Sequence, residues 1–175
     1  VDEIPDGRFA LCEIKGGDEA CARDIAAFVK AKAVPEEKLA FIGFDFELMV
    51  LLKRLLVEAG KSQMQVISLK DAYSEAVALE HIAIASGAGL DGVDFEADAS
   101  VVTKSVVEAA QDAEVHIGVW IWADRLPMSD GVANVAAFHD LGVTFFTSDL
   151  PPDVCEWMAS PSTTASPCSS CGPCE

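Results

Sequence analysis

The sequence predicts a parallel α/β fold in which strands and helices alternate along the chain. Short apolar runs recur about every 25 to 29 residues, and amphipathic segments fill the intervals between them. The short runs are rich in β-branched and aromatic residues and apolar on both faces, which is typical of buried parallel strands. We predict strands at Phe9–Lys15, Lys38–Phe44, Met64–Leu69, Leu90–Phe95, Val115–Trp122 and Val143–Ser148.

The intervening segments carry the signals of helices. Ala22, Ile25, Ala26 and Val29 fall on one helical stripe, and several segments open on an Asp or Ser that can cap the first turn. Glycines such as Gly60 follow the last helical residue, where a left-handed conformation is needed. The predicted helices are Asp18–Ala33, Asp45–Ala59, Asp71–Ala85, Ser100–Ala113 and Ser129–Leu141.

The alternation implies a parallel sheet with right-handed crossovers, but it fits two architectures. Six strands suit either an open doubly wound sheet or most of an eight-stranded barrel. The sequence KGGD after the first strand lacks the glycine spacing of a phosphate-binding loop, which weighs against a nucleotide-binding open sheet. A complete barrel takes about 250 residues, so six units would leave a barrel two units short.

The composition limits the classes of partner. The chain has 29 acidic and 12 basic residues, a formal net charge of −17, and would repel a phosphate backbone, so we expect no nucleic-acid partner. No apolar run approaches the roughly 20 residues of a membrane span. The amino end opens on Val1 without a basic-then-apolar signal segment, which leaves the compartment open.

The cysteines separate the carboxyl end from the rest. Cys12, Cys21 and Cys155 are scattered and are expected to be free, buried thiols. Cys168, Cys171 and Cys174 form a CxxCxxC run that is short of a fourth ligand for a tetrahedral metal site. We expect a barrel-type domain over residues 1–154 and a flexible Ser/Pro/Cys-rich tail over 155–175, with metal capture or disulfides as alternatives for the tail.

Two same-face pairs stand at predicted strand ends, where the sites of parallel α/β folds gather. Glu13 and Lys15 share strand parity, so together they can serve a cation and a phosphate, or form a plain ion pair. Trp120 and Trp122 also share parity and either wall a pocket or fill the core.

The remaining polar candidates carry weaker signals. His81, His116 and His139 lack the spacing of a metal site or a catalytic triad, and we interpret them as structural or solvent-facing. The acidic cluster after the fourth strand could contribute to a metal site, but loop solvation is the expected role; its members are Asp91, Asp94, Glu96 and Asp98.

Taken in order, five segments resemble the glycerophosphodiester phosphodiesterase family of barrel enzymes. Glu13-Ile14-Lys15 looks like the family's EIK strand, and Phe41–Leu55 is similar to its strand-and-helix segment with Gly43 in place of a serine. The other three segments are Leu90–Ala97 (LDGVDFEA, similar to GVDGIN), Val119–Asp124 (VWIWAD, at the place of VWTVN) and Leu141–Pro151 (LGVTFFTSDLP, similar to GVDGIITDRP, with Leu150 replacing arginine).

This resemblance implies a TIM-type (β/α) barrel of which strands three to eight are present. It also implies a metal-dependent hydrolase that cleaves glycerophosphodiesters to glycerol phosphate and an alcohol. In that family Glu13 would match a ligand of Mg or Ca, Lys15 the catalytic lysine that neutralises the phosphate, and Trp120 and Phe44 the aromatic residues of the substrate pocket. A cation and a lysine on phosphate oxygens stabilise developing charge.

The resemblance also shows what this stretch lacks. The family's catalytic histidines, in a His-Arg and a His-Asp pair, and its Glu-x-Asp metal ligands would lie before Val1, in the first two units. Acid–base catalysis needs such groups within hydrogen-bond reach, so we expect this chain alone to be inactive. A non-catalytic binding or scaffold domain is the alternative, and a phospho-acceptor domain of the response-regulator kind is a third, less favoured, hypothesis.

Overall fold

A computed structural model describes residues 4–5, 7–121 and 128–148 of the chain. Within these residues, six parallel strands form a single sheet and alternate with helices, as the sequence predicts. The strands are β1 (Ala10–Glu13), β2 (Leu39–Gly43), β3 (Val66–Lys70), β4 (Gly92–Glu96), β5 (His116–Ile121) and β6 (Phe145–Ser148). The predicted boundary between residues 154 and 155 and the tail beyond it lie outside the described residues.

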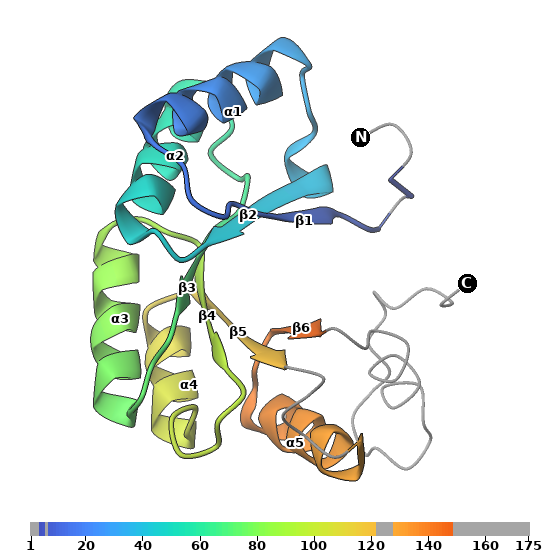
Figure 1. Ribbon diagram of the computed structural model, residues 1–175, viewed down its shortest axis with the longest axis vertical. Coiled ribbons are helices and arrows are strands. Elements are labelled where there is room, and N and C mark those ends of the chain that lie inside the picture. The colour runs from blue at the N-terminus through green and yellow to red at the C-terminus, as the bar shows by residue number, and fades with distance from the viewer. Residues whose placement is uncertain (1–3, 6, 122–127, 149–175) are drawn as a thin grey trace.

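The order of the strands decides between the two candidate architectures. Each strand pairs with the next strand along the chain, in the order β1-β2-β3-β4-β5-β6. A doubly wound sheet, including that of a response regulator, reverses its order at a switch point, and no reversal occurs here. The sheet curves with its helices on the outer side (Figure 1). The fold is therefore a partial (β/α) barrel of the TIM type.

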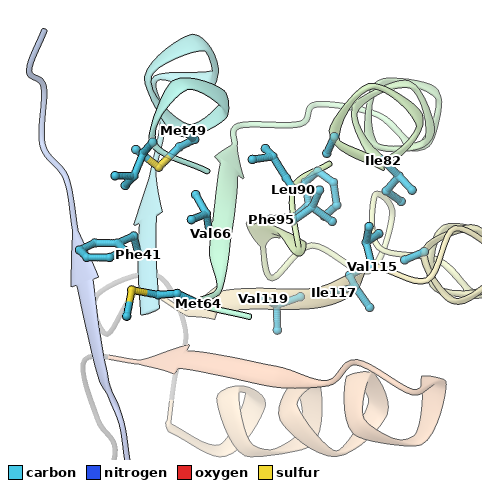
Figure 2. Close-up of a cluster of buried hydrophobic side chains, with 14 of the residues drawn as sticks. Phe41, Met49, Met64, Val66, Ile82, Leu90, Phe95, Val115, Ile117 and Val119 are labelled. Carbon is cyan, nitrogen blue, oxygen red and sulfur yellow. The ribbon is translucent and has the colours of Figure 1, made fainter. Parts of the chain in front are cut away.

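The core lies between the outer face of the sheet and the helices. Figure 2 shows Val66 and Phe95 of the sheet beside Met49 and Ile82 of the covering helices. Phe41 of β2 belongs to the same cluster, and all five side chains are at most 4% exposed. Full burial of a side chain of this size stabilises the fold by about 1.5–3 kcal/mol. This layer of packing fixes the strands, and hence the strand ends that carry the candidate site.

The predicted helices all form, with different caps at two of them. They are α1 (Glu19–Ala31), α2 (Phe46–Glu58), α3 (Glu75–Gly87), α4 (Lys104–Asp112) and α5 (Met128–Leu141), and a short 3₁₀ turn, η1 (Glu36–Lys38), precedes β2. Asp18 and Asp45 cap α1 and α2 as expected. The expected starts of the next two helices at Asp71 and Ser100 are wrong, because Ser74 and Thr103 accept the capping hydrogen bonds.

Gly60 shows why a glycine follows a helix in this fold. Its φ of +78° is left-handed, a conformation that disfavours any residue with a Cβ. Its backbone N–H donates to the carbonyl of Val57 at 3.0 Å, so the turn that ends α2 also satisfies the last carbonyls of that helix. Gly142, with a φ of +100°, ends α5 in the same way.

The inner face of the sheet carries a smaller apolar cluster. It consists of Ile42, Ile67, Leu69 and Trp120, with Leu11 and Phe145 packed against it. β2 to β5 are buried on both faces, whereas β1 and β6, at the two edges of the described sheet, are only partly buried. The expectation of full burial is therefore wrong for these two strands. None of the helices in the described residues is both long and apolar enough to cross a bilayer.

Candidate functional site

A pocket lies on the inner face of the sheet, where β1, β2, β5 and β6 end. Its volume is about 350 Å³, within the lower range of small-molecule sites. The lining residues are Leu11, Glu13, Lys15, Ile42, Phe44, Leu69, Trp120, Ile121, Thr147 and Ser148. The four residues that the sequence singles out as site candidates, Glu13, Lys15, Phe44 and Trp120, all belong to this lining. Their individual roles stay predictions.

Glu13 and Lys15 form the charged wall of the pocket. Strand parity places both on the inner face, and Lys15 Nζ lies 3.2 Å from Glu13 Oε2. The Lys15 side chain is 80% exposed and that of Glu13 35% exposed, so solvent screens the pair and it contributes less than about 1 kcal/mol. An ammonium group held this weakly can turn toward an anionic ligand at small cost. The ion pair and the binding role are thus compatible.

Phe44 and Trp120 form the aromatic wall. Their ring centroids lie 5.6 Å apart with an interplanar angle of 70°, an edge-to-face contact that holds both rings in place. Trp120 is buried, and among the described residues no group accepts a hydrogen bond from its indole Nε1–H. Phe44 is 52% exposed at the rim. The wall therefore offers an apolar surface together with one buried donor that no described group satisfies.

The described residues do not make a complete site for the divalent metal that the resemblance implies. Glu13 is the one carboxylate among the lining residues described, whereas Mg²⁺ and Ca²⁺ take six or more oxygen ligands. Nowhere in the described part of the chain do three His, Cys, Asp or Glu side chains gather closely enough to hold an ion. Glu13 can therefore supply one ligand of such an ion.

Asp94 is a polar group that the sequence interpretation placed wrongly. It was assigned to a solvated loop, but it lies within β4 and is completely buried on the inner face. Thr147, which lines the pocket, donates a hydrogen bond from Oγ1 to Asp94 Oδ2 at 3.2 Å. No described group bonds to Oδ1. Strand parity was the available signal, because Asp94 alternates with the outward-facing Val93 and Phe95.

Burial controls the acidity of this carboxyl group. It raises the pKa of Asp94 to about 7, although the hydrogen bonds from Thr147 and from the Phe95 backbone act in the opposite direction. Phe145 covers the neighbouring position on β5. A Cβ at Gly118, the register neighbour of Asp94 on β5, would coincide with the Phe145 ring. The aromatic ring thus lies over Gly118 and shields the inner face next to Asp94.

The other members of the acidic group serve structural purposes. Asp91 precedes β4, accepts from Lys53 Nζ at 2.7 Å and from the Val66 backbone N–H at 2.8 Å, and thereby ties α2 to the sheet. Asp98 accepts from the backbone and side chain of Ser100, which closes a turn after β4. Solvation is therefore the correct interpretation for the exposed Asp98 and the wrong one for Asp91.

The histidines lie away from the pocket, as the sequence predicts. His81 of α3 is buried on the outer side of the sheet, 3.0 Å from Ser68 Oγ through its Nε2. Burial, and secondarily the charge of Lys70, lowers the pKa of His81 to about 4. His116 opens β5 at the end opposite the pocket, and His139 lies in α5. None of the three is a lining residue.

The cysteines differ from the sequence prediction in their exposure. Cys12 and Cys21 are free thiols, but Cys12 is exposed and Cys21 half-buried rather than both being buried. Other residues named in the sequence predictions lie outside the described part of the chain: Trp122, Leu150, Cys155, Cys168, Cys171 and Cys174.

Fold and pocket together define a partial TIM-type barrel with a carboxyl-end site. Comparison with solved structures agrees. A Galdieria sulphuraria protein assigned to the glycerophosphodiester phosphodiesterases superposes with a TM-score of 0.67 at 17% identity, over 87% of this chain and 57% of its own. A glycerophosphoryl diester phosphodiesterase from Parabacteroides distasonis gives 0.63 at 13% identity, over 90% and 53%.

The likeness extends to barrels with other activities. Deoxyribose phosphate aldolase from Aeropyrum pernix superposes with a TM-score of 0.59 at 12% identity, over 81% of this chain and 62% of its own. At such identities the comparisons establish the fold alone. The chain spans slightly more than half the length of the phosphodiesterase structures that it matches. No family model and no curated protein sequence matches the chain.

Proposed function

We propose that this chain forms the substrate-binding side of a metal-dependent phosphoric diester hydrolase. The full-length parent would cleave glycerophosphodiesters to glycerol phosphate and an alcohol. The observation that carries the proposal is the convergence of Glu13, Lys15, Phe44 and Trp120, drawn from three separate strands or strand ends, on one pocket at the carboxyl end of the sheet. These are the positions at which the sequence resembles glycerophosphodiester phosphodiesterases.

The chemistry of the lining suits a glycerophosphodiester. Lys15 brings an exposed ammonium group that can bind a phosphate oxygen. Among the described lining residues it is the one with a positive charge. Trp120 and Phe44 offer apolar surface to the carbon skeleton of glycerol or its alcohol partner. Glu13 would supply one ligand toward Mg or Ca.

Binding of a phosphodiester to the chain tests the proposal. Calorimetric titration with glycerophosphoglycerol should show saturable binding, and Lys15→Met should weaken it about tenfold, the scale of one charge-assisted hydrogen bond. Lys104→Met is the matched control, because Lys104 is an exposed lysine on α4 paired with Glu108. The absence of binding to the unaltered chain, or equal losses in the two variants, would contradict the proposal.

A non-catalytic binding or scaffold domain is the second candidate. One observation favours it: the described residues bring no histidine to the pocket, and acid–base catalysis depends on such a group. Both candidates predict ligand binding, so turnover separates them. Hydrolysis of the same diester by the longest natural product that contains residues 1–175 would support the hydrolase. Binding without hydrolysis in that product would support the binding domain.

A further inference from the structure

Asp94 and Thr147 form a pair in which a buried carboxyl group accepts a hydrogen bond from the hydroxyl of a lining residue of the pocket. Asp94 is fully buried in β4 and is not a lining residue of the pocket, whereas Thr147 of the edge strand β6 lines it. The Thr147 hydroxyl donates a hydrogen bond from Oγ1 to Asp94 Oδ2 at 3.2 Å. Among the described contacts, this hydrogen bond connects Asp94 to a lining residue of the pocket.

We propose that Asp94 is a positioning residue that couples phosphodiester binding in this pocket to the uptake of a proton. The inference rests on the proposed function, because it takes the anion as the ligand of the pocket. Its chemistry is that of a hydroxyl group whose single proton can serve only one acceptor at a time.

The two protonation states of Asp94 present different groups to the pocket. When Asp94 is ionised, it can only accept, so the Thr147 hydroxyl donates inward and turns its lone pairs toward the ligand. When Asp94 is protonated, its own O–H can donate to Thr147 Oγ1, and the hydroxyl proton of Thr147 becomes free to donate to a phosphate oxygen. Protonation also removes a negative charge beneath the pocket. Both effects favour an anion in the protonated state.

The surroundings of Asp94 allow this titration near neutral pH. Its register neighbours on β3 and β5 are Leu69 and Gly118, and burial raises the pKa of Asp94 to about 7. The charged or titratable groups on the elements around it are Glu96 on β4, Lys70 at the end of β3, His116 at the start of β5, and Glu13 and Lys15 across the inner face on and after β1.

Dimethyl phosphate is the probe that tests the coupling, because its single charge does not titrate between pH 5.5 and 8.5. Calorimetry in two buffers of different ionisation enthalpy counts the protons taken up. The unaltered chain should bind the diester about tenfold more tightly at pH 5.5 than at pH 8.5, the scale of one hydrogen bond to a charged group, with net proton uptake near pH 7.

Three variants separate the coupling from other causes of pH dependence. Asp94→Asn should bind at both pH values with nearly equal affinity and without proton uptake. Thr147→Val should bind weakly at both, and Thr147→Ser should restore the pH dependence. The carboxyl ¹³C resonance of Asp94 gives its titration directly, and the Thr147 Cβ resonance should follow it in the ligand-free chain and lose that titration in Asp94→Asn.

The outcomes distinguish the two proposals. Binding whose pH dependence is unchanged in Asp94→Asn would overturn the coupling and leave the proposed function standing. Failure of the unaltered chain to bind dimethyl phosphate or glycerophosphoglycerol at any pH would overturn both. A Thr147 resonance that ignores the titration of Asp94 would overturn the coupling even if the variants did not fold.

Discussion

Replacement of His81 should change how the stability of the chain depends on pH. The imidazole is buried between α3 and the sheet, where it shares one hydrogen bond with the hydroxyl of Ser68. It also packs edge-on against Phe46 and Phe95, with ring centroids 5.6 and 6.0 Å away. Its pKa is lowered from 6.5 to about 4, mainly by burial. The unfolded chain therefore binds a proton at this residue that the folded chain refuses.

The sign and size of the pH effect on stability follow from the difference between the His81 pKa of the folded and the unfolded chain. Above pH 6.5 His81 is neutral in both states, so its contribution is fully present. As the pH falls from 6.5 to about 4 the unfolded state gains protons first, and stability is lost. At 1.36 kcal/mol for each pH unit, the loss reaches at most about 3 kcal/mol. Asp94, whose pKa is raised, makes the chain more stable as the pH falls. That contribution is the same in the unaltered chain and in a His81 variant, so it cancels in the comparison.

Urea unfolding at pH 7.5 and pH 4, followed by circular dichroism, measures this loss. His81→Gln keeps a polar partner for Ser68 and does not titrate, so the variant should lose about 3 kcal/mol less than the unaltered chain on acidification. His116→Gln, which removes an exposed histidine at the start of β5, should follow the unaltered chain. Parallel losses in the unaltered chain and His81→Gln would refute the reasoning.

Three further outcomes are expected. The chain alone should release no glycerol phosphate from glycerophosphoglycerol with Mg²⁺ or Ca²⁺, because no described histidine reaches the pocket; Glu13-dependent release in a coupled assay would contradict this. Phe95→Ala should cost about 3–5 kcal/mol in urea unfolding, since Phe95 is fully buried; a cost below about 1 kcal/mol would be inconsistent with that packing. Gly118→Ala should cost about 1–3 kcal/mol by clashing with Phe145, and Phe145→Leu in the same chain should recover part of it.

The sequence predicts all six strands and five helices, because their apolar periodicity is a local property. The exact ends of the helices are harder to predict from that periodicity. The start of α3 depends on Ser74 rather than Asp71 as the cap, and both residue types are good N-caps. Apolar periodicity does not distinguish an open sheet from a barrel. It depends on which strands are neighbours, and only the sequential pairing from β1 to β6 settles it.

The candidate site divides in the same way. Glu13 and Lys15 could be placed on one face from strand parity, and the family resemblance added Phe44 and Trp120. For Asp94, strand parity predicts the inner face, because it alternates with the outward-facing Val93 and Phe95. Parity does not predict its hydrogen bond from Thr147, which lies about fifty residues further along the chain.

We propose that the pocket at the carboxyl end of the sheet binds a phosphodiester. Backbone and indole amide shifts of the ¹⁵N-labelled chain, recorded during titration with glycerophosphoglycerol, test it most directly. We expect the largest shifts at Glu13, Lys15, Phe44 and the indole of Trp120. Shifts at Glu36, Gln63 and Gln65, which line a separate pocket beside Phe9, or no saturable shifts at all, would contradict the account.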